Sequence, residues 1–398
     1  MALGFNSLRE TDCGPIYENL DYGYDKSQKK ESKNMSVIDK IKKNSTIKES
    51  GILSKSKFFT DKDMIPTAIP VMNIALSGSL DGGLSSGLTI MAGPSKHFKT
   101  SFSLLLAKAY LDKYPEAALL FYDSEFGTPQ DYFTSFGIDT DRVIHSPITD
   151  IEQLKFDIVN QIKEFERSDK IMILIDSVGN LASKKETEDA LDGKSVADMT
   201  RAKQLKSLFR MVTPHLTLKD IPMVVVNHTY KTQEMFSKDV VSGGTGIYYS
   251  SDTIFIIGRQ QEKEGTDVVG YNFIINVEKS RFVKEKSKIP VCVSFDGGIS
   301  TWSGLMDLAL ESGHCIKPKN GWYAKVDIKS GEVIDKNYRI KDTNTKDFWV
   351  PILSDQKFKD FIENKYKMSS GSMINLEVSD VDISNTFNSK EEDDSDEN

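Results

Sequence analysis

Residues 88–101 read Leu88-Thr-Ile-Met-Ala-Gly93-Pro-Ser-Lys-His-Phe-Lys99-Thr100-Ser101, and an apolar helical pattern follows. A strand, then a loop, then a helix is the context that a Walker A phosphate loop requires. Backbone N–H groups of such a loop point at phosphate oxygens, and the dipole of the following helix favours anions there. The stretch therefore predicts a nucleotide-binding site formed by Gly93, Pro94, Ser95, Lys96, His97, Phe98, Lys99, Thr100 and Ser101.

Two side chains of this loop have expected roles in nucleotide chemistry. Lys99 is placed to reach the β- and γ-phosphates, and the Thr100 hydroxyl is placed to ligate Mg²⁺. One position departs from the motif G-x-x-x-x-G-K-[ST], because Phe98 stands where its second glycine belongs. If that position needs a positive φ, phenylalanine is a poor occupant. The alternative is an ordinary strand-to-helix turn.

Acidic residues follow two later apolar runs. Asp176 ends the run 171–176, which is the Walker B pattern, and a carboxylate there is placed to hold Mg²⁺. Glu125 follows the run 117–123 and is placed to orient or deprotonate a water that attacks the γ-phosphate. The alternative is that Asp123 and Glu125 cap the following helix.

Two further residues are candidates for contacts with the nucleotide. Tyr132 is placed to stack on adenine, and the alternative is a surface tyrosine. His228 follows an apolar run and is placed to sense the γ-phosphate through a hydrogen bond, and the alternative is a loop histidine with ordinary partners. Together with Asp176, they complete the predicted nucleotide site.

Apolar runs and helical patterns alternate along the chain, which predicts an α/β fold with a mainly parallel central sheet. The last two strands are expected to pair antiparallel, because no long helical segment joins them. The eight expected strands are 88–93, 117–123, 142–146, 171–176, 221–227, 252–258, 271–279 and 289–295.

The order of these patterns predicts five regions. They are a disordered extension at 1–34, an N-terminal oligomerisation arm at 35–64, an ATPase core at 65–300, a small α/β appendage at 301–376 and an acidic disordered tail at 377–398. In the arm, Val37, Ile38 and Ile41 predict a short amphipathic helix. The arm is either a solvated cationic segment or one that docks on a neighbouring subunit or on nucleic acid.

Charge and cysteine content narrow the functional class. Residues 377–398 hold nine acids and one lysine, so they account for the whole net charge of −8. The rest of the chain is neutral and compatible with a locally basic groove for nucleic acid. No run approaches the ~20 apolar residues that span a bilayer. Three cysteines without metal-ligand spacing predict reduced thiols in a cytosol.

Two polar segments are candidate DNA-binding loops. The segment 228–246 mixes lysines, aromatics and glycines, which suits a loop that orders on a nucleic-acid backbone. The segment 183–194 precedes a helix expected from about Ala197, with Lys203, Lys206 and Arg210 on one face. The candidate DNA contacts are Lys184, Lys185, Arg201, Lys231, Phe236, Lys238, Gly243 and Gly244.

A late cluster of cations contains Lys279 and Arg281, remote in sequence from the phosphate loop. Such a cluster is placed to act as arginine-finger-like groups on the nucleotide of the next subunit. The alternative is a sheet edge protected by charge.

Taken together, these stretches resemble the RecA family, most closely the recombinases of T-even-like bacteriophages, over roughly residues 35–350. The similarity is carried by 56–59, 70–78, 92–99, 120–127, 175–191, 227–230, 233–238, 276–281 and 317–323. The phage type also has an aromatic at position 98. Residues 1–34 have no counterpart in the family.

The resemblance implies an ATP- and Mg²⁺-dependent ATPase that forms a helical filament on single-stranded DNA and exchanges strands with a homologous duplex. It implies Lys99 and Thr100 at phosphate and Mg²⁺, Glu125 as the catalytic glutamate, Asp176 as Walker B and Tyr132 near adenine. His228 stands where the family has a γ-phosphate-sensing glutamine. Lys279 and Arg281 match cations that act across the subunit interface, and 183–197 and 228–246 match the two DNA-binding loops.

The implied partners are single-stranded and duplex DNA, further copies of the chain, a single-strand-binding protein and a recombination mediator. The implied location is the cytoplasm of an infected bacterium, with no membrane contact. A ring-shaped helicase or other motor with the same core is the alternative enzyme, because sequence does not separate a ring from a filament. A DNA-coating mediator with a dead site is the non-enzyme alternative, and the intact Lys99, Glu125 and Asp176 argue against it.

Overall fold

The computed structural model describes residues 36–47, 50–56, 63–193, 199–233 and 237–368. The expected extension at 1–34 and acidic tail at 377–398 lie outside the described residues, as does Phe236. The chain divides into two units, 1–56 and 57–398, each of which is described by itself.

The first unit contains helix α1, Val37–Asn44, and the 3-10 helix η1, Leu53–Lys55. Ser36 caps α1, because its hydroxyl accepts a hydrogen bond from the N–H of Asp39. The predicted amphipathic helix is present. Its apolar residues Val37, Ile38 and Ile41 are 71%, 53% and 66% exposed.

The second unit is built on a nine-stranded sheet in the order β11-β10-β9-β8-β1-β5-β4-β2-β3. Its strands are β1 (Gly87–Ala92), β2 (Ala118–Asp123), β3 (Val143–Pro147), β4 (Ile171–Asp176), β5 (Pro222–Asn227), β8 (Thr253–Glu264), β9 (Asp267–Lys279), β10 (Lys288–Ser294) and β11 (Gly298–Ile299). All eight predicted strands are present. The buried β1, β4 and β5 are almost wholly apolar, as expected for parallel strands covered on both faces.

The sheet has a parallel half and an antiparallel half. Strands β8, β1, β5, β4, β2 and β3 run parallel, and β8 to β11 pair antiparallel through hairpins. The predicted antiparallel pairing of β9 with β10 is therefore confirmed. Because parallel strands share one direction, the carboxyl ends of β1, β2, β4 and β5 open on the same side of the sheet.

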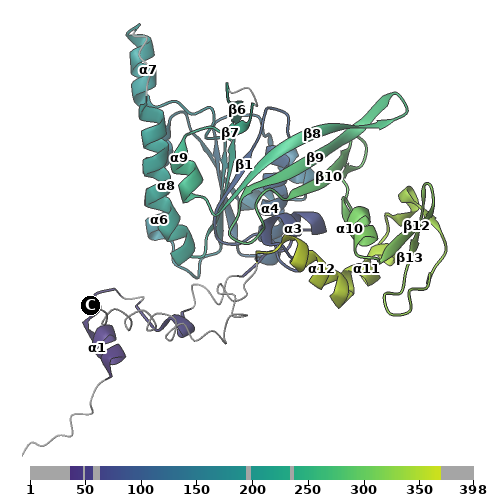
Figure 1. Ribbon diagram of the computed structural model, residues 1–398. Coiled ribbons are helices and arrows are strands. Elements are labelled where there is room, and N and C mark those ends of the chain that lie inside the picture. Colours follow the sequence, from purple (N-terminus) through teal and green to yellow (C-terminus); the bar gives the residue numbers. More distant parts are fainter. Residues whose placement is uncertain (1–35, 48–49, 57–62, 194–198, 234–236, 369–398) are drawn as a thin grey trace, which may run out of the picture. The chain divides into compact units, whose positions relative to one another are not determined.

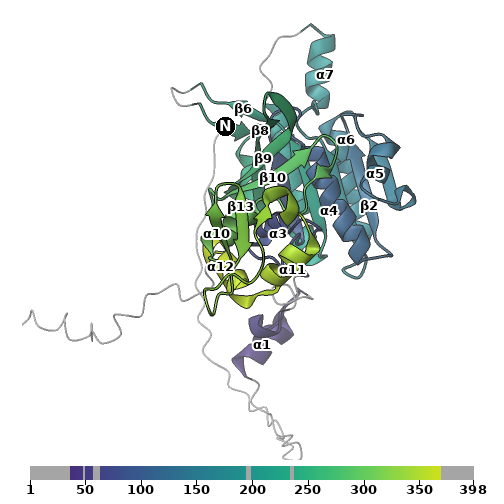
Figure 2. The ribbon, with the colours of Figure 1, turned by 90° about the vertical axis from the view of Figure 1, so that its right-hand side faces the viewer.

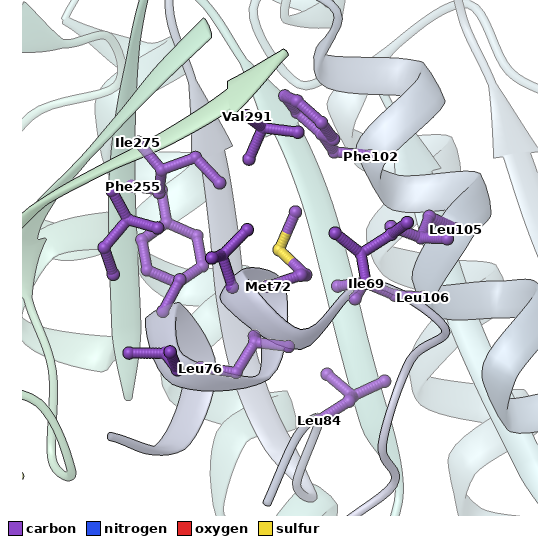
Figure 3. Packing of buried hydrophobic residues seen from close by; sticks show 14 of the residues in the cluster. Ile69, Met72, Leu76, Leu84, Phe102, Leu105, Leu106, Phe255, Ile275 and Val291 are labelled. Atoms are coloured by element: carbon purple, nitrogen blue, oxygen red, sulfur yellow. The ribbon is translucent and has the colours of Figure 1, made fainter. Parts of the chain in front are cut away.

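Helices cover both faces of the sheet (Figure 1). On one face, α3 (Pro70–Ser77), α4 (Lys99–Lys113) and α5 (Gln130–Ser135) pack in one apolar cluster. Figure 3 shows Met72 of α3 between the sheet residue Phe255 and the α4 residue Leu106, with Leu76 of the same helix below Met72 in this view. On the other face, α6 (Ile151–Glu164), α8 (Thr200–Leu218) and α9 (Thr245–Ser250) pack in a second cluster, and η2 (Thr140–Arg142) leads into β3.

The C-terminal appendage combines a small sheet with three helices, in agreement with the α/β expectation (Figure 2). Its elements are α10 (Leu305–Glu311), β12 (Cys315–Lys319), β13 (Trp322–Lys325), β14 (Tyr338–Arg339), η3 (Ile340–Thr343), α11 (Lys346–Ser354) and α12 (Gln356–Tyr366). Phe348, Trp349 and Phe358 of this region are buried in the same apolar cluster as α3 and α4.

One expectation about the two polar loops is wrong. The segment predicted as a loop from Ser183 contains helix α7, Lys184–Leu191, which projects from the core in both ribbon views (Figures 1 and 2). A capping box fixes its start, because Ser183 and Glu186 each accept from the other's backbone N–H. The second segment contains a two-stranded ribbon of β6, Thr229–Lys231, and β7, Asp239–Val241.

Within the described residues, none of the helices combines the length and apolar character needed to cross a bilayer.

Candidate functional site

A cavity of about 670 Å³ lies at the carboxyl ends of the central strands. Residues 95–101, which follow β1, line it. Glu125 after β2, Asp176 at the end of β4 and His228 after β5 line the same space. Residues at or just after the carboxyl ends of four different strands therefore line one cavity. The sequence predicted this only by analogy with other open α/β sheets.

The phosphate loop holds two non-glycine residues in the left-handed conformation, Lys96 with φ of 61° and Phe98 with φ of 62°. The position that the motif assigns to glycine thus requires a positive φ, as suspected. The strain at such a residue costs on the order of 1–3 kcal/mol. The Phe98 ring offsets part of it by stacking on Phe273 at 5.1 Å and meeting Phe102 edge-on at 5.4 Å.

Lys99 begins α4 and is only 7% exposed. Its Nζ donates to the carbonyl oxygen of Pro94 at 2.8 Å, across the loop. Burial lowers the pKa of this ammonium, while the nearby carboxylates of Glu125 and Asp176 raise it. A cation held against a loop of backbone amides is suited to a polyphosphate.

Thr100 and Asp176 form the part of the site that fits a divalent cation. The Thr100 hydroxyl donates to Oδ2 of Asp176 at 2.6 Å, and Oδ1 of Asp176 is buried with no hydrogen-bond partner in the described chain. Burial raises the pKa of this carboxyl to about 6. Carboxylate and hydroxyl oxygens are ligands that Mg²⁺ prefers, and Oδ1 of Asp176, which has no other partner among the described residues, could coordinate the ion.

Glu125 is held by three donors that all reach its Oε1 atom. Ser177 Oγ lies at 2.7 Å, Asn180 Nδ2 at 3.1 Å and His228 Nε2 at 3.1 Å. The hydrogen bond from His228, opposed by burial, keeps the pKa of Glu125 below its usual value. The carboxylate is therefore ionised at neutral pH and able to accept a proton.

Asp123 explains how Glu125 reaches the cavity. Its Oδ1 accepts the backbone N–H groups of Glu125 and Phe126 at 3.1 and 2.8 Å. Asp123 thus caps a tight turn, not the following helix, which begins only at Gln130. The helix-capping alternative does not describe these contacts.

Only part of the remaining lining was predicted from sequence. Tyr132 lines the cavity, and its hydroxyl hydrogen-bonds the Ser101 hydroxyl. Arg259 of β8, Tyr271 of β9 and Phe295, which follows β10, also line it, and sequence reasoning missed them. The Arg259 guanidinium lies 4.6 Å from the Tyr271 ring centre and donates to the carbonyl of Lys96. No motif marks these residues, because the hairpin brings them to the loop only after folding.

Lys279 and Arg281 do not belong to the set of described residues that line this cavity. Lys279 Nζ donates to the carbonyl of Tyr248 at 2.7 Å, and Arg281 pairs with Asp252. Burial, and then the charge of Arg281, lower the pKa of Lys279. Both cations lie at the end of β9, away from their own phosphate loop.

The candidate DNA contacts fall in three places. Lys184 and Lys185 are exposed in the first turn of α7, and Lys231 and Lys238 are exposed beside the β6–β7 ribbon. The side chain of Asn227 donates to the carbonyl of Ser242, which ties the two ends of this segment together. Cations are thereby displayed on both of the predicted DNA-binding segments.

Arg201 and the glycines have partners or packing inside the chain. The Arg201 guanidinium donates to the carbonyls of Leu181, Val178 and Gly179. A Cβ at Gly243 would lie 2.4 Å from Ile247, and φ is 99° at Gly243 and 76° at Gly244. Arg201, Gly243 and Gly244 therefore shape the two segments, and their predicted contact with DNA stays a prediction.

Two family models together match most of the chain. The model described as the RecA N-terminal domain matches residues 32–300. The model described as the C-terminal domain of the bacteriophage T4 recombination and repair protein matches residues 302–362. The second match covers the appendage, which has no counterpart in the first.

Individual relatives agree with these matches. The chain is 54% identical over 354 residues to the "Recombination and repair protein" of Enterobacteria phage T4, covering 88% of this chain and 90% of that one. It is 28% identical over 265 residues to "Protein RecA" of Streptomyces rimosus, covering 66% and 68%. With "Protein RecA" of Paenarthrobacter aurescens it shares 26% identity over 292 residues, covering 71% and 79%.

Proposed function

Because the chain belongs to the RecA family, we propose that it is a DNA strand-exchange recombinase of the phage type, driven by ATP hydrolysis. The observation that carries the proposal is the meeting of Lys99, Thr100, Glu125 and Asp176 around one cavity at the carboxyl ends of β1, β2 and β4. The relatives favour a recombinase over the ring-shaped motor.

The residues of the cavity suit phosphoryl transfer to water. The loop amides and Lys99 would hold the β- and γ-phosphates. Thr100 and Asp176 would hold Mg²⁺, which when bound would supply positive charge at the phosphate oxygens. Glu125 accepts a proton from water as the water oxygen bonds to the γ-phosphorus. The bond from that phosphorus to the β-γ bridging oxygen breaks, and ADP and phosphate leave. His228 fixes Glu125 and faces the same space.

The base of the nucleotide is proposed to stack on the aromatic residues that line the cavity. These are Tyr132, Tyr271 and Phe295. Aromatic faces stack on a purine, and the neighbouring Arg259 supplies a cation near the sugar and phosphates.

DNA is proposed to bind along the projecting helix α7 and the β6–β7 ribbon. Lys184, Lys185, Lys231 and Lys238 are exposed there and neutralise phosphates, and the predicted aromatic contact Phe236 lies outside the described residues. Single-stranded DNA and its homologous duplex are the proposed substrates, with a single-strand-binding protein and a mediator as partners in the cytoplasm of an infected bacterium.

Self-association into a filament is supported by two features. The apolar face of α1 is exposed and offers a surface for another copy of the chain. Lys279 and Arg281 stand away from their own cavity, which suits action on the nucleotide of a neighbour. The ends of such an assembly stay open when the contact is heterologous and does not close.

The test is the Glu125→Gln variant, which keeps the shape of the side chain and removes the base. DNA-stimulated phosphate release should fall by at least ~10²-fold, within the range for loss of a general base. Binding of a fluorescent ATP analogue and of single-stranded DNA should persist. Glu116→Gln, an exposed glutamate after α4, is the matched control and should keep full turnover. Full turnover in Glu125→Gln would refute the assigned base.

A further inference from the structure

The carboxylate of Asp123 connects two parts of the molecule that the proposed function uses separately. It is only 3% exposed at the end of β2. Its Oδ1 holds the turn that carries Glu125, through the N–H groups of Glu125 and Phe126. Its Oδ2 lies 3.1 Å from Nε2 of His145 on the neighbouring strand β3.

The ring of His145 is held in a defined orientation by its neighbour Phe121. Its ring stacks on Phe121 with centres 5.5 Å apart and planes 23° apart, so the imidazole is oriented toward Asp123. Its side chain is 51% exposed, because β3 is the terminal strand of the sheet. Neither His145 nor Asp123 lines the cavity beside Glu125, as far as the described residues show.

We propose that His145 and Asp123 are positioning residues for the catalytic glutamate. His145 donates its Nε2 hydrogen to Asp123, Asp123 fixes the 124–126 turn, and the turn aims Glu125 at the attacking water. The proposal rests on the proposed function, since it needs Glu125 as the base. It requires that loss of His145 lower the rate of the chemical step without weakening nucleotide binding.

Three physical reasons support a link from His145 through Asp123 to the turn that carries Glu125. The turn contains Phe126 at φ of 54°, a strained conformation that persists only where its surroundings hold it. A buried carboxylate that loses one of its donors shifts toward its other partners or toward water. A displacement of about 1 Å in a catalytic group costs on the order of 10²-fold in rate, so a partial shift has a measurable effect.

The experiment compares three replacements of one residue. His145→Ala removes the donor and the ring, His145→Phe keeps the stacking on Phe121 but removes the donor, and His145→Gln supplies an amide N–H near the Nε2 position. We expect the Ala and Phe variants to lose about 10-fold in kcat with single-stranded DNA saturating, less than the ~10²-fold cost of a full 1 Å displacement. KM for ATP and filament length in electron micrographs should be unchanged, and Gln should restore most of kcat.

A double variant tests whether His145 acts through Asp123. Asp123→Ala alone should cost more than His145→Ala, and the pair together should be no worse than Asp123→Ala alone. Additive losses, or a normal kcat in both His145→Ala and His145→Phe, would overturn the proposal. Equal losses in all three His145 variants with shortened filaments would also overturn it, in favour of a subunit contact. Full turnover in Glu125→Gln would contradict the proposed function itself. No result from the His145 and Asp123 variants would do so, and the two failures are therefore distinguishable.

Discussion

The proposed nucleotide cavity and the C-terminal appendage differ in which side chains they bury and in how their backbone is strained. Around the cavity, charged side chains are buried and non-glycine residues adopt positive φ, as at Lys96, Phe98 and Phe126. In the appendage, the described residues with positive φ are all glycines. Aromatic rings fill its interior, with Trp349 stacked 6.4 Å from Trp302 and edge-on to Phe348 at 5.1 Å.

This difference separates function from stability. Burying a charge and straining a backbone both cost free energy, and both occur where a ligand is expected to repay them. Burying an aromatic ring gains free energy whether or not a ligand binds. Substitution of a charged side chain in the cavity should therefore remove activity and spare the fold, and substitution of a buried ring in the appendage should do the reverse.

The largest expected effect is on stability, from Trp349→Ala. Trp349 is 1% exposed and belongs to the cluster that also holds α3 and α4. Its removal should lower the free energy of unfolding by about 3–5 kcal/mol, the usual range for a buried tryptophan. Urea denaturation measures the change, and kcat for ATP should stay within about twofold at a temperature where the variant is folded.

The matched variant Trp349→Phe refines this prediction. The Nε1 of Trp349 has no hydrogen-bond partner among the described residues, so phenylalanine removes a buried polar group along with some volume. It should lose clearly less stability than alanine does. A large drop in kcat with normal stability in either variant would break the separation of the two regions.

The second effect is on activity, from Lys99→Ala. Loss of a preorganised charge at the transferring phosphoryl group typically costs ~10²–10³ in rate. Stability should not fall, because the variant also removes a desolvated ammonium from the interior. Phosphate release and urea denaturation of the same sample check both halves of the prediction.

Mixed assemblies extend this test to Lys279. If Lys279 acts on a neighbour, Lys99→Ala protein mixed with Lys279→Ala protein should recover part of the phosphate release. Some interfaces would then combine an intact loop with an intact lysine. No recovery at any ratio, with mixed filaments verified, would argue against action between subunits.

The strands and the phosphate loop could be predicted from sequence because each depends on local pattern. A buried parallel strand appears in the sequence as a continuous apolar run, and the phosphate loop has a fixed spacing. The positions of β1, β4 and Asp176 can therefore be predicted from sequence alone. Helix α7 was missed although its capping box, Ser183 and Glu186, is written in the sequence. The polar composition of this segment favoured a loop, and the capping box that marks the start of a helix was not used.

The residues that could not be predicted depend on tertiary contacts. Arg259 and Phe295 reach the cavity only because β8–β10 fold back toward the phosphate loop. His145 and Asp123 are 22 residues apart and meet only because β2 and β3 are adjacent in parallel register. No periodicity or spacing encodes such contacts, since they follow from strand order.

A third prediction concerns pH and the buried carboxyl of Asp176. Burial raises the pKa of this carboxyl in the folded protein to about 6. Between about pH 4 and 6, the folded state therefore keeps a proton on Asp176 that the unfolded state has lost. Stability of the ligand-free protein should fall as pH rises through this window. At pH 7 the cost should reach about 2–3 kcal/mol relative to a neutral side chain.

Asp176→Asn isolates this effect, because it removes the titrating group and keeps the size. The variant should be more stable than the parent at pH 7, with the difference shrinking toward pH 4.5. Urea denaturation across this range, without nucleotide or Mg²⁺, gives the comparison. A constant difference at all pH values would show that the carboxyl does not titrate in the window.

The smallest expected effect tests whether strain and packing are both present at Phe98. Glycine there relieves the left-handed backbone and removes the ring, whereas alanine removes the ring and keeps the strain. Both variants should be less stable than the parent, because the contacts with Phe102 and Phe273 are lost. Alanine should be worse than glycine by about 1 kcal/mol, the usual cost of a Cβ at positive φ. Affinity for a fluorescent ATP analogue should remain within a few-fold in Phe98→Gly, because the loop amides keep their positions. If Phe98→Ala proved the more stable of the two, the positive φ would carry no strain, and the cavity would resemble the appendage in being held by packing alone.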